Sequence, residues 1–240
     1  MKTLSAFTWI LPLGCAAVLS ACNTSEPLPQ CTVGRGEHAV RYSLVSGSGP
    51  CAQKHAEIIG AQIFRTPGSG IPPSLEFKAA SLAANQGKDT ANSVTASGDF
   101  TTEYPSEDEL CLVPTMSSAR QRIVQADGTT KDLSYQWSNI RVQGSAAIPG
   151  TQWAADLTYT ENDCNATYTV VGLFPAIKCE KKVTVTNPDG TTTTVTEPDP
   201  SVCQKPQPGL SIDPTFPTTC DETAHLCVLK GEPPSQIRQP

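Results

Sequence analysis

Cysteine is the residue type that most constrains how this chain can fold. Ten cysteines occur in 240 residues, and most of them are spread along the region that follows residue 30. Cysteines at this density are unusual in a reducing compartment, whereas exported proteins pair an even number of them as disulfides. The eight that we expect to form disulfides are Cys31, Cys51, Cys111, Cys164, Cys179, Cys203, Cys220 and Cys227.

Residues 1–21 have the features of a secretory signal peptide. One basic residue, Lys2, precedes a mostly apolar run over residues 4–19, as in the n-region and h-region of such peptides. The run contains Pro12 and Gly14 and is shorter than the roughly twenty apolar residues that span a bilayer. Cleavage after this run would remove Cys15 from the mature chain.

The apolar run ends in Leu19-Ser20-Ala21-Cys22, which resembles the lipobox of bacterial lipoproteins. The resemblance implies cleavage before Cys22, which would carry a thioether-linked diacylglycerol and an amide-linked acyl chain such as palmitate. It also implies the outer membrane, because Asn23 rather than Asp follows the cysteine; whether the protein faces the periplasm or the cell surface stays open. The alternative is an ordinary signal peptide cut after Ala21, which would leave Cys22 as an odd thiol.

The mature chain is expected to contain a short tether and a β-rich domain. Residues 22–30 would form the lipidated cysteine and the tether, residues 31–230 the domain, and residues 231–240 a disordered tail. The domain is either one unit or two subdomains that divide near residues 115–145. Threonine is abundant and charged residues are only 17 %, which favours strands over helices. The net charge of −6 disfavours nucleic acid as a partner.

Apolar residues alternate along the chain in short runs that predict antiparallel strands. Two Asp-Gly pairs, Asp127-Gly128 and Asp189-Gly190, lie between such runs and predict hairpins. Helical periodicity is weak, and we expect at most two turns of helix within residues 81–91. The fold class predicted is therefore all-β and antiparallel, sandwich-like, stabilised by disulfides and rich in long loops.

The second Asp-Gly turn also suggests one disulfide. Cys179 and Cys203 are almost equally distant from it, so a regular hairpin would bring them together at its base. Cys220 and Cys227 would close a small loop. The remaining pairs, Cys31 with Cys51 and Cys111 with Cys164, are guesses among the many connectivities that eight cysteines allow.

The three histidines show no catalytic motif. His38, His55 and His225 lie neither beside a Gly-x-Ser-x-Gly elbow nor in a cysteine-protease signature. The segment from Cys220 through His225 to Cys227 resembles a zinc clip, but a structural zinc site needs reduced thiols and export favours a disulfide. We therefore expect neither a metal nor a cofactor.

The acidic residues Glu103, Glu107, Asp108 and Glu109 could in principle ligate calcium. They lack the alternating Asp or Asn residues and the bend glycine of a calcium loop. A solvated loop is the better interpretation.

Two features could serve binding. Tyr135 with Trp137, and Trp153 with Tyr159, share strand faces that could stack on sugars, although such faces more often form a core. Residues 181–200 form a Thr-rich hairpin with few apolar residues, which predicts an exposed arm whose edge could recruit a partner strand.

These observations favour an envelope lipoprotein that acts as a structural or binding module without catalysis. Its expected partners are the membrane, through lipid on Cys22, and a protein or a glycan. The alternatives are an envelope hydrolase with a histidine site assembled in space around His38 or His55, and a carbohydrate-binding module.

Overall fold

The computed structural model of the protein describes residues 29–66, 70–145, 147–204 and 212–234. Thirteen strands lie in this part of the chain, together with one short α-helix and two 3₁₀ turns. The elements are β1 (Gly36–Gly47), η1 (Pro50–Ala52), β2 (Glu57–Phe64), β3 (Ser74–Ala79), α1 (Ala80–Ala83), β4 (Ala96–Asp99), β5 (Leu110–Thr115), β6 (Ala119–Val124), β7 (Thr130–Gln143), β8 (Gln152–Glu161), β9 (Cys164–Leu173), β10 (Glu180–Thr186), β11 (Thr192–Pro198), η2 (Pro200–Gln204), β12 (Thr218–Asp221) and β13 (Leu226–Leu229).

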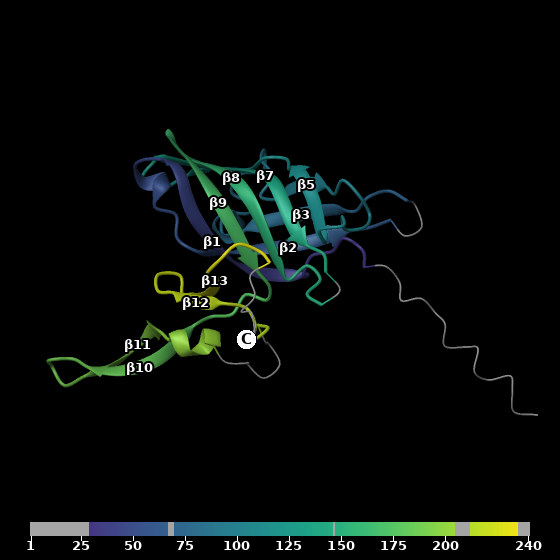
Figure 1. The fold of residues 1–240 in the computed structure, drawn as a ribbon. Coiled ribbons are helices and arrows are strands. Elements are labelled where there is room, and N and C mark those ends of the chain that lie inside the picture. Colours follow the sequence, from purple (N-terminus) through teal and green to yellow (C-terminus); the bar gives the residue numbers. More distant parts are fainter. Residues whose placement is uncertain (1–28, 67–69, 146, 205–211, 235–240) are drawn as a thin grey trace, which may run out of the picture.

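Nine strands form one antiparallel sheet in the order β4-β3-β2-β1-β9-β8-β7-β5, with β6 also paired to β7. The sheet curls until its edges meet (Figure 1). The N–H of Thr101 donates to the carbonyl of Leu112 over 2.8 Å, and the N–H of Ser117 donates to the carbonyl of Ser97 over 2.8 Å. The predicted all-β, antiparallel, disulfide-stabilised class is confirmed. In place of the two packed sheets of a sandwich, one nearly closed, barrel-like sheet encloses the core.

The interior of this sheet is filled by the apolar residues that alternate along its strands. Trp137, Trp153 and Phe77 are at most 1 % exposed, and their ring centroids lie 4.6 to 6.0 Å apart. Gly172 is the cross-strand neighbour of Trp153, and a Cβ at this position would lie 2.1 Å from the indole. Only glycine therefore leaves room for the Trp153 ring against β9.

The C-terminal residues cover part of the outer face of the sheet. β12 and β13 form a two-stranded sheet of their own, and Leu226 and Val228 of β13 pack with Ala39 of β1 in one apolar cluster. Arg41 Nε donates to the carbonyl of Leu229 over 2.8 Å. The outer face of β1 is consequently covered by β13 around Ala39 and Arg41, while Val45 farther along this face stays exposed.

Both predicted Asp-Gly turns are present. They connect β6 to β7 and β10 to β11, and in each turn the Asp carboxylate accepts the N–H of the Thr two residues later at 2.9 Å. The helix expected within residues 81–91 is the single turn of α1 and the turns that follow it. Residues 115–145, where a division was considered, carry β6 and β7, which both belong to the nine-stranded sheet.

Several predictions fall on residues outside the described part. These are the signal peptide of residues 1–21, the lipidation of Cys22 and most of the tether and tail. Among the residues that are described, no helix is long and apolar enough to cross a bilayer.

Candidate interaction site

The hairpin β10–β11 forms an arm, residues 180–198, that stands apart from both sheets (Figure 1). In the described part of the chain its strands pair only with each other, from Glu180 opposite Pro198 to Thr186 opposite Thr192. Nearly all of its side chains are exposed. The exposed arm predicted from the sequence is therefore confirmed, and none of the described residues forms a strand along the second edge of β10 or of β11.

The two faces of the arm differ in chemistry. Val183 and Val195 are cross-strand partners, and they share their face with Val185 because side chains alternate along a strand. Val185 and Val195 are 40 % and 38 % exposed. The opposite face carries Thr side chains and Lys182. The valine face also carries Thr193 and the Lys181–Glu197 ion pair, so the arm presents a small patch of three valines, bordered by polar side chains, that stays partly exposed.

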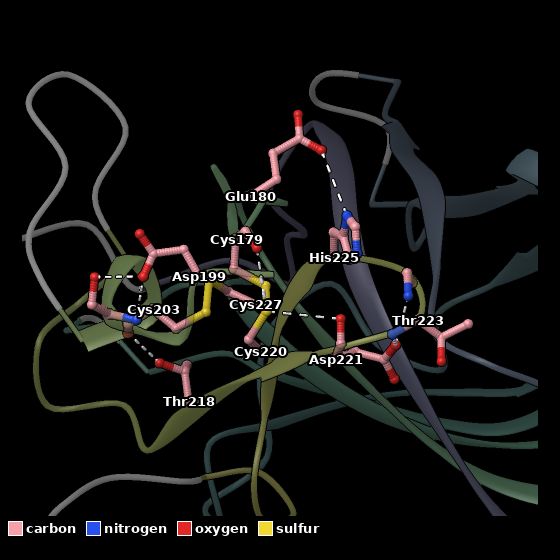
Figure 2. The surroundings of a disulfide bond; sticks show 12 residues. Cys179, Glu180, Asp199, Cys203, Thr218, Cys220, Asp221, Thr223, His225 and Cys227 are labelled. Carbon is pink, nitrogen blue, oxygen red and sulfur yellow. Dashed lines mark hydrogen bonds and ion pairs between the residues drawn. A yellow bond between two sulfur atoms is a disulfide. The ribbon is translucent and has the colours of Figure 1, made fainter. Parts of the chain in front are cut away.

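Two disulfides clamp the base of the arm to the C-terminal sheet (Figure 2). Cys179, directly before β10, is bonded to Cys220 of β12, and Cys203, in η2, is bonded to Cys227 of β13. All four cysteines are buried. Each flank of the arm is fixed to a different strand of one small sheet, so the covalent framework sets the direction of the arm.

This framework corrects two predicted disulfides, since Cys179–Cys203 and Cys220–Cys227 are wrong. The hairpin register brings Asp199 opposite Cys179, and the N–H of Asp199 donates to the carbonyl of Cys179 over 2.8 Å. The turn η2 then carries Cys203 towards β13. Cys220 and Cys227 do oppose each other across β12 and β13, but each forms its bond to a flank of the arm.

The other two predicted disulfides, Cys31–Cys51 and Cys111–Cys164, are also wrong. The bonds present are Cys31–Cys111 and Cys51–Cys164. β1 pairs with β9 in antiparallel register, so the end of β1 brings Cys51 beside the start of β9 at Cys164. All eight cysteines that we expected to form disulfides do so.

The candidate metal ligands do not supply free thiols. Among the described residues, the sulfurs of Cys179, Cys203 and Cys220 lie within 4.8 Å of one another, but all three belong to disulfides and only a thiolate is a ligand. His225 Nδ1 lies 4.0 Å from Glu180 Oε2 (Figure 2). The acidic residues at 107–109 are exposed in a loop.

His38 lies in the core and is fully buried. Its Nε2 lies 2.7 Å from the carbonyl oxygen of Gly34, and its Nδ1 accepts a hydrogen bond from Trp153 Nε1 over 3.1 Å. These contacts place the proton on Nε2 and use both ring nitrogens. Burial lowers the pKa of His38 to about 4, although the Gly34 carbonyl opposes this shift. His55, by contrast, is exposed.

Acid should destabilise the fold through His38. An unfolded histidine takes up a proton below pH 6.5, whereas folded His38 resists it down to about pH 4. The free energy of unfolding therefore has its full value, as far as His38 is concerned, above pH 6.5. Between pH 6.5 and pH 4 it falls by about 3 kcal/mol because of this residue. Urea unfolding of wild type and His38→Gln across pH 4 to 7 checks this, and the variant should lose less stability. Parallel curves for the two proteins would contradict it.

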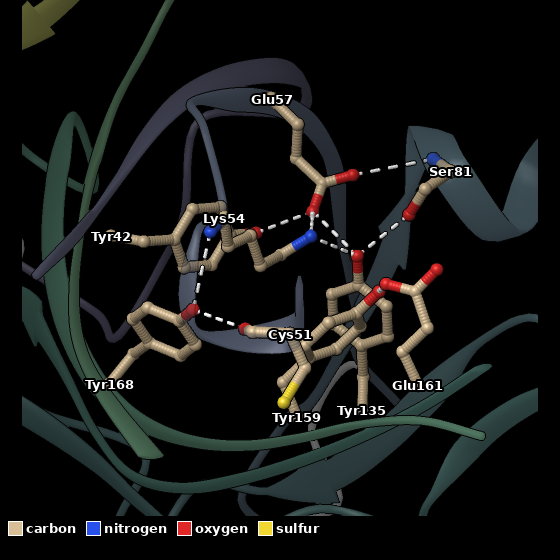
Figure 3. Close-up of polar contacts among 9 residues, drawn as sticks. All are labelled: Tyr42, Cys51, Lys54, Glu57, Ser81, Tyr135, Tyr159, Glu161 and Tyr168. Atoms are coloured by element: carbon tan, nitrogen blue, oxygen red, sulfur yellow. Dashed lines mark hydrogen bonds and ion pairs between the residues drawn. The ribbon is translucent and has the colours of Figure 1, made fainter. Parts of the chain in front are cut away.

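A second polar cluster closes one end of the barrel-like sheet (Figure 3). Lys54 Nζ lies 2.6 Å from Glu57 Oε1, and the two side chains are only 10 % and 12 % exposed. The ammonium sits 4.6 to 4.7 Å from the ring centroids of Tyr42, Tyr135 and Tyr159. Such contacts between a cation and aromatic faces gain strength when water is excluded.

Glu57 is the centre of this cluster. Its Oε1 accepts hydrogen bonds from Tyr42 at 2.6 Å and from Tyr135 at 2.8 Å, and its Oε2 accepts the N–H of Ser81 at 3.3 Å. Burial alone would raise the pKa of Glu57, but Lys54 and the two phenols outweigh it and hold this pKa below its ordinary value. Burial and the nearby carboxylate raise the pKa of both phenols. The cluster is thus an ion pair among neutral phenols, with its donors satisfied.

The aromatic faces noted in the sequence belong to the core. Tyr135, Trp137 and Trp153 are at most 1 % exposed, and Tyr159 is 6 % exposed. They cannot present an open platform to a sugar in this conformation.

The lipobox at residues 19–22 and the similarity to a lipoprotein make this chain a bacterial lipoprotein, whose domain is antiparallel β-structure cross-linked by disulfides. The family model described as MlpA matches residues 36–175, more than half of the sequence, so the chain belongs to the MlpA family. A relative named "Putative lipoprotein MlpA" from Myxococcus xanthus is 26 % identical over 245 residues, covering 95 % of this chain and 96 % of the relative. No solved structure matches. The matched residues comprise β1 to β9, so the arm lies beyond them.

Proposed function

We propose that this lipoprotein is a binding module of the outer membrane that works without catalysis, held by lipid on Cys22 and recruiting a protein partner through its arm. The observation that carries the proposal is the arm itself. Two strand edges that no described residue pairs with, and a partly exposed patch of valines, are held in a fixed direction by Cys179–Cys220 and Cys203–Cys227.

The physical basis is strand addition. An exposed edge offers a row of backbone N–H and C=O groups to an extended segment of another protein, and side chains on alternate positions add specificity. Binding is weakened by any ordering that it requires. An arm that is already folded and cross-linked at its base avoids most of this loss.

The polar groups of the domain support a role without catalysis. A general base must reach a substrate proton, yet both nitrogens of His38 are engaged inside the core. The Lys54–Glu57 pair is enclosed by tyrosines and makes its contacts within the protein. Both His38 and the Lys54–Glu57 pair are therefore better suited to stabilising the sheet than to catalysing a reaction.

A photo-crosslinking amino acid at Thr184 of the arm tests the proposal in intact cells. We expect a discrete adduct with another envelope protein, because Thr184 is exposed on β10. The matched control is the same amino acid at Thr158, which is exposed on β8 of the main sheet and should give no such adduct. Peptide mapping should place the partner's residue in a strand; equal labelling from both positions would contradict a role for the arm.

A further inference from the structure

The tether leaves the domain at a defined end of the barrel-like sheet. The N–H of Cys31 donates to the carbonyl of Glu103 over 2.9 Å, and Arg65 Nη1 donates to Gln30 Oε1 over 2.7 Å. Arg65 also donates to the carbonyl of Cys31, and Cys31 is bonded to Cys111. Gln30 is therefore fixed where β2 ends, at the end of the molecule where the purple N-terminal segment begins (Figure 1).

Three large apolar or aromatic side chains are exposed around this exit. Phe64, Ile71 and Tyr104 are 45 %, 65 % and 43 % exposed, and we call them the tether-end patch. Phe64 immediately precedes Arg65 and Tyr104 immediately follows Glu103, the two residues that hold the start of the tether.

Ile71 lies at the same end of the sheet because it belongs to the connection between β2 and β3. The N–H of Phe100 donates to the carbonyl of Pro73 over 2.9 Å, which fixes the segment after Ile71 beside the segment that leads to Tyr104. The β2–β3 register, with Phe64 opposite Ser74, completes the arrangement. The three patch residues thus come from connections that meet at one end of the sheet.

The length of the tether limits how far this patch can lie from the bilayer. The eight residues from Asn23 to Gln30 reach at most about 26 Å when fully extended. If Cys22 carries lipid, the tether end of the domain cannot be farther than that from the bilayer. Aromatic and aliphatic side chains beside an anchor are favoured at the interface between headgroups and acyl chains.

The charges near the patch select the kind of lipid. Arg65 is an exposed cation beside Phe64, but the carboxylates of Glu103, Glu107, Asp108 and Glu109 around Tyr104 outnumber it, and the net charge of the chain is −6. An anionic bilayer would repel this end, whereas a zwitterionic one would not.

We propose that the tether-end patch lies in the interface of a zwitterionic phospholipid bilayer, so that the domain rests on the membrane by this end and does not swing freely. This inference rests on the proposed lipidation of Cys22. Residues at the other end of the sheet, such as Val124 at the end of β6 and the Lys54 cluster, then point away from the lipid.

Tryptophan fluorescence in vesicles tests the orientation. The full lipidated protein would carry Ile71→Trp or Phe64→Trp, or Val124→Trp as the matched control, because Val124 is 72 % exposed at the opposite end. The native Trp137 and Trp153 are buried and give a constant background. In phosphatidylcholine vesicles brominated along the acyl chains, the patch tryptophans should shift to the blue and lose roughly half of their emission, as expected for indoles at the interface. The control should not change.

The possible failures are distinguishable. Mass analysis of the N-terminal peptide and flotation with vesicles report the anchor separately: a protein that carries no lipid and does not float overturns the proposed lipidation and the patch with it. A protein that floats while its patch tryptophans stay unquenched, or are quenched no more than Val124→Trp, overturns the patch alone. Stronger quenching in phosphatidylglycerol than in phosphatidylcholine would overturn the assignment to zwitterionic lipid.

Discussion

Replacing Lys54 by Met should lower the free energy of unfolding by about 3–5 kcal/mol, the effect of leaving one partner of a buried ion pair unpaired. The substitution leaves the Glu57 carboxylate inside the tyrosine cage without its counter-ion. The hydroxyls of Tyr42 and Tyr135 still donate to it, but they carry no charge to balance it. Urea unfolding of the oxidised protein at pH 7 measures the difference.

Lys131→Met is the matched control for this prediction. Lys131 also pairs with a glutamate, Glu161, at 2.9 Å, but its side chain is 41 % exposed. Pairs in contact with solvent contribute about 0–1 kcal/mol, so this variant should unfold almost like the wild type. If the two substitutions had equal effects, the Lys54 cluster would not be what stabilises this end of the sheet.

The strands and turns were predictable because they depend on neighbours in the sequence. Side chains on a strand alternate with a period of two, so the alternation from Trp153 to Tyr159 was enough to predict β8 and its buried face. Asp-Gly favours the tight turns of hairpins, and both Asp-Gly pairs form them. The hairpin arm followed from the same local rules.

The disulfides were not predictable because they depend on how distant strands are ordered. The pairing of β1 with β9 brings Cys51 to Cys164 across 113 residues, and no spacing in the sequence encodes that neighbour. Cys179 and Cys203 are almost equally distant from the Asp189-Gly190 turn, but the hairpin ends before Cys203, which lies in η2.

The Lys54 cluster was missed for the same reason. Lys54 and Glu57 look like an ordinary surface pair three residues apart, and the tyrosines that enclose them come from β1, β7 and β8. Only the curling of the sheet brings these rings around one ammonium. Tyrosines at inward-facing strand positions were the one available signal, since a buried phenol usually has a polar partner.

Removing the Cys51–Cys164 disulfide by a double Ser substitution should be among the most destabilising changes in the protein. Chain entropy assigns a bond that closes a loop of this length about 5 kcal/mol, and its sequence separation of 113 is the largest of the four disulfides. The bond also fixes η1, which precedes Lys54. The carbonyl of Cys51 accepts the hydroxyl of Tyr168, which in turn accepts the N–H of Lys54 at 3.3 Å.

The matched control is the double Ser variant of Cys203 and Cys227, whose separation is only 24. The same model assigns this bond about 3.5 kcal/mol, and its loss should loosen the arm and the C-terminal sheet more than the main sheet. Urea unfolding followed by the fluorescence of the buried Trp137 and Trp153 reports on the sheet alone. We therefore expect a large fall in the unfolding midpoint for the first variant and a smaller one for the second. The reverse order would mean that the arm and C-terminal sheet, rather than the loop tied down by Cys51, limit the stability of the domain.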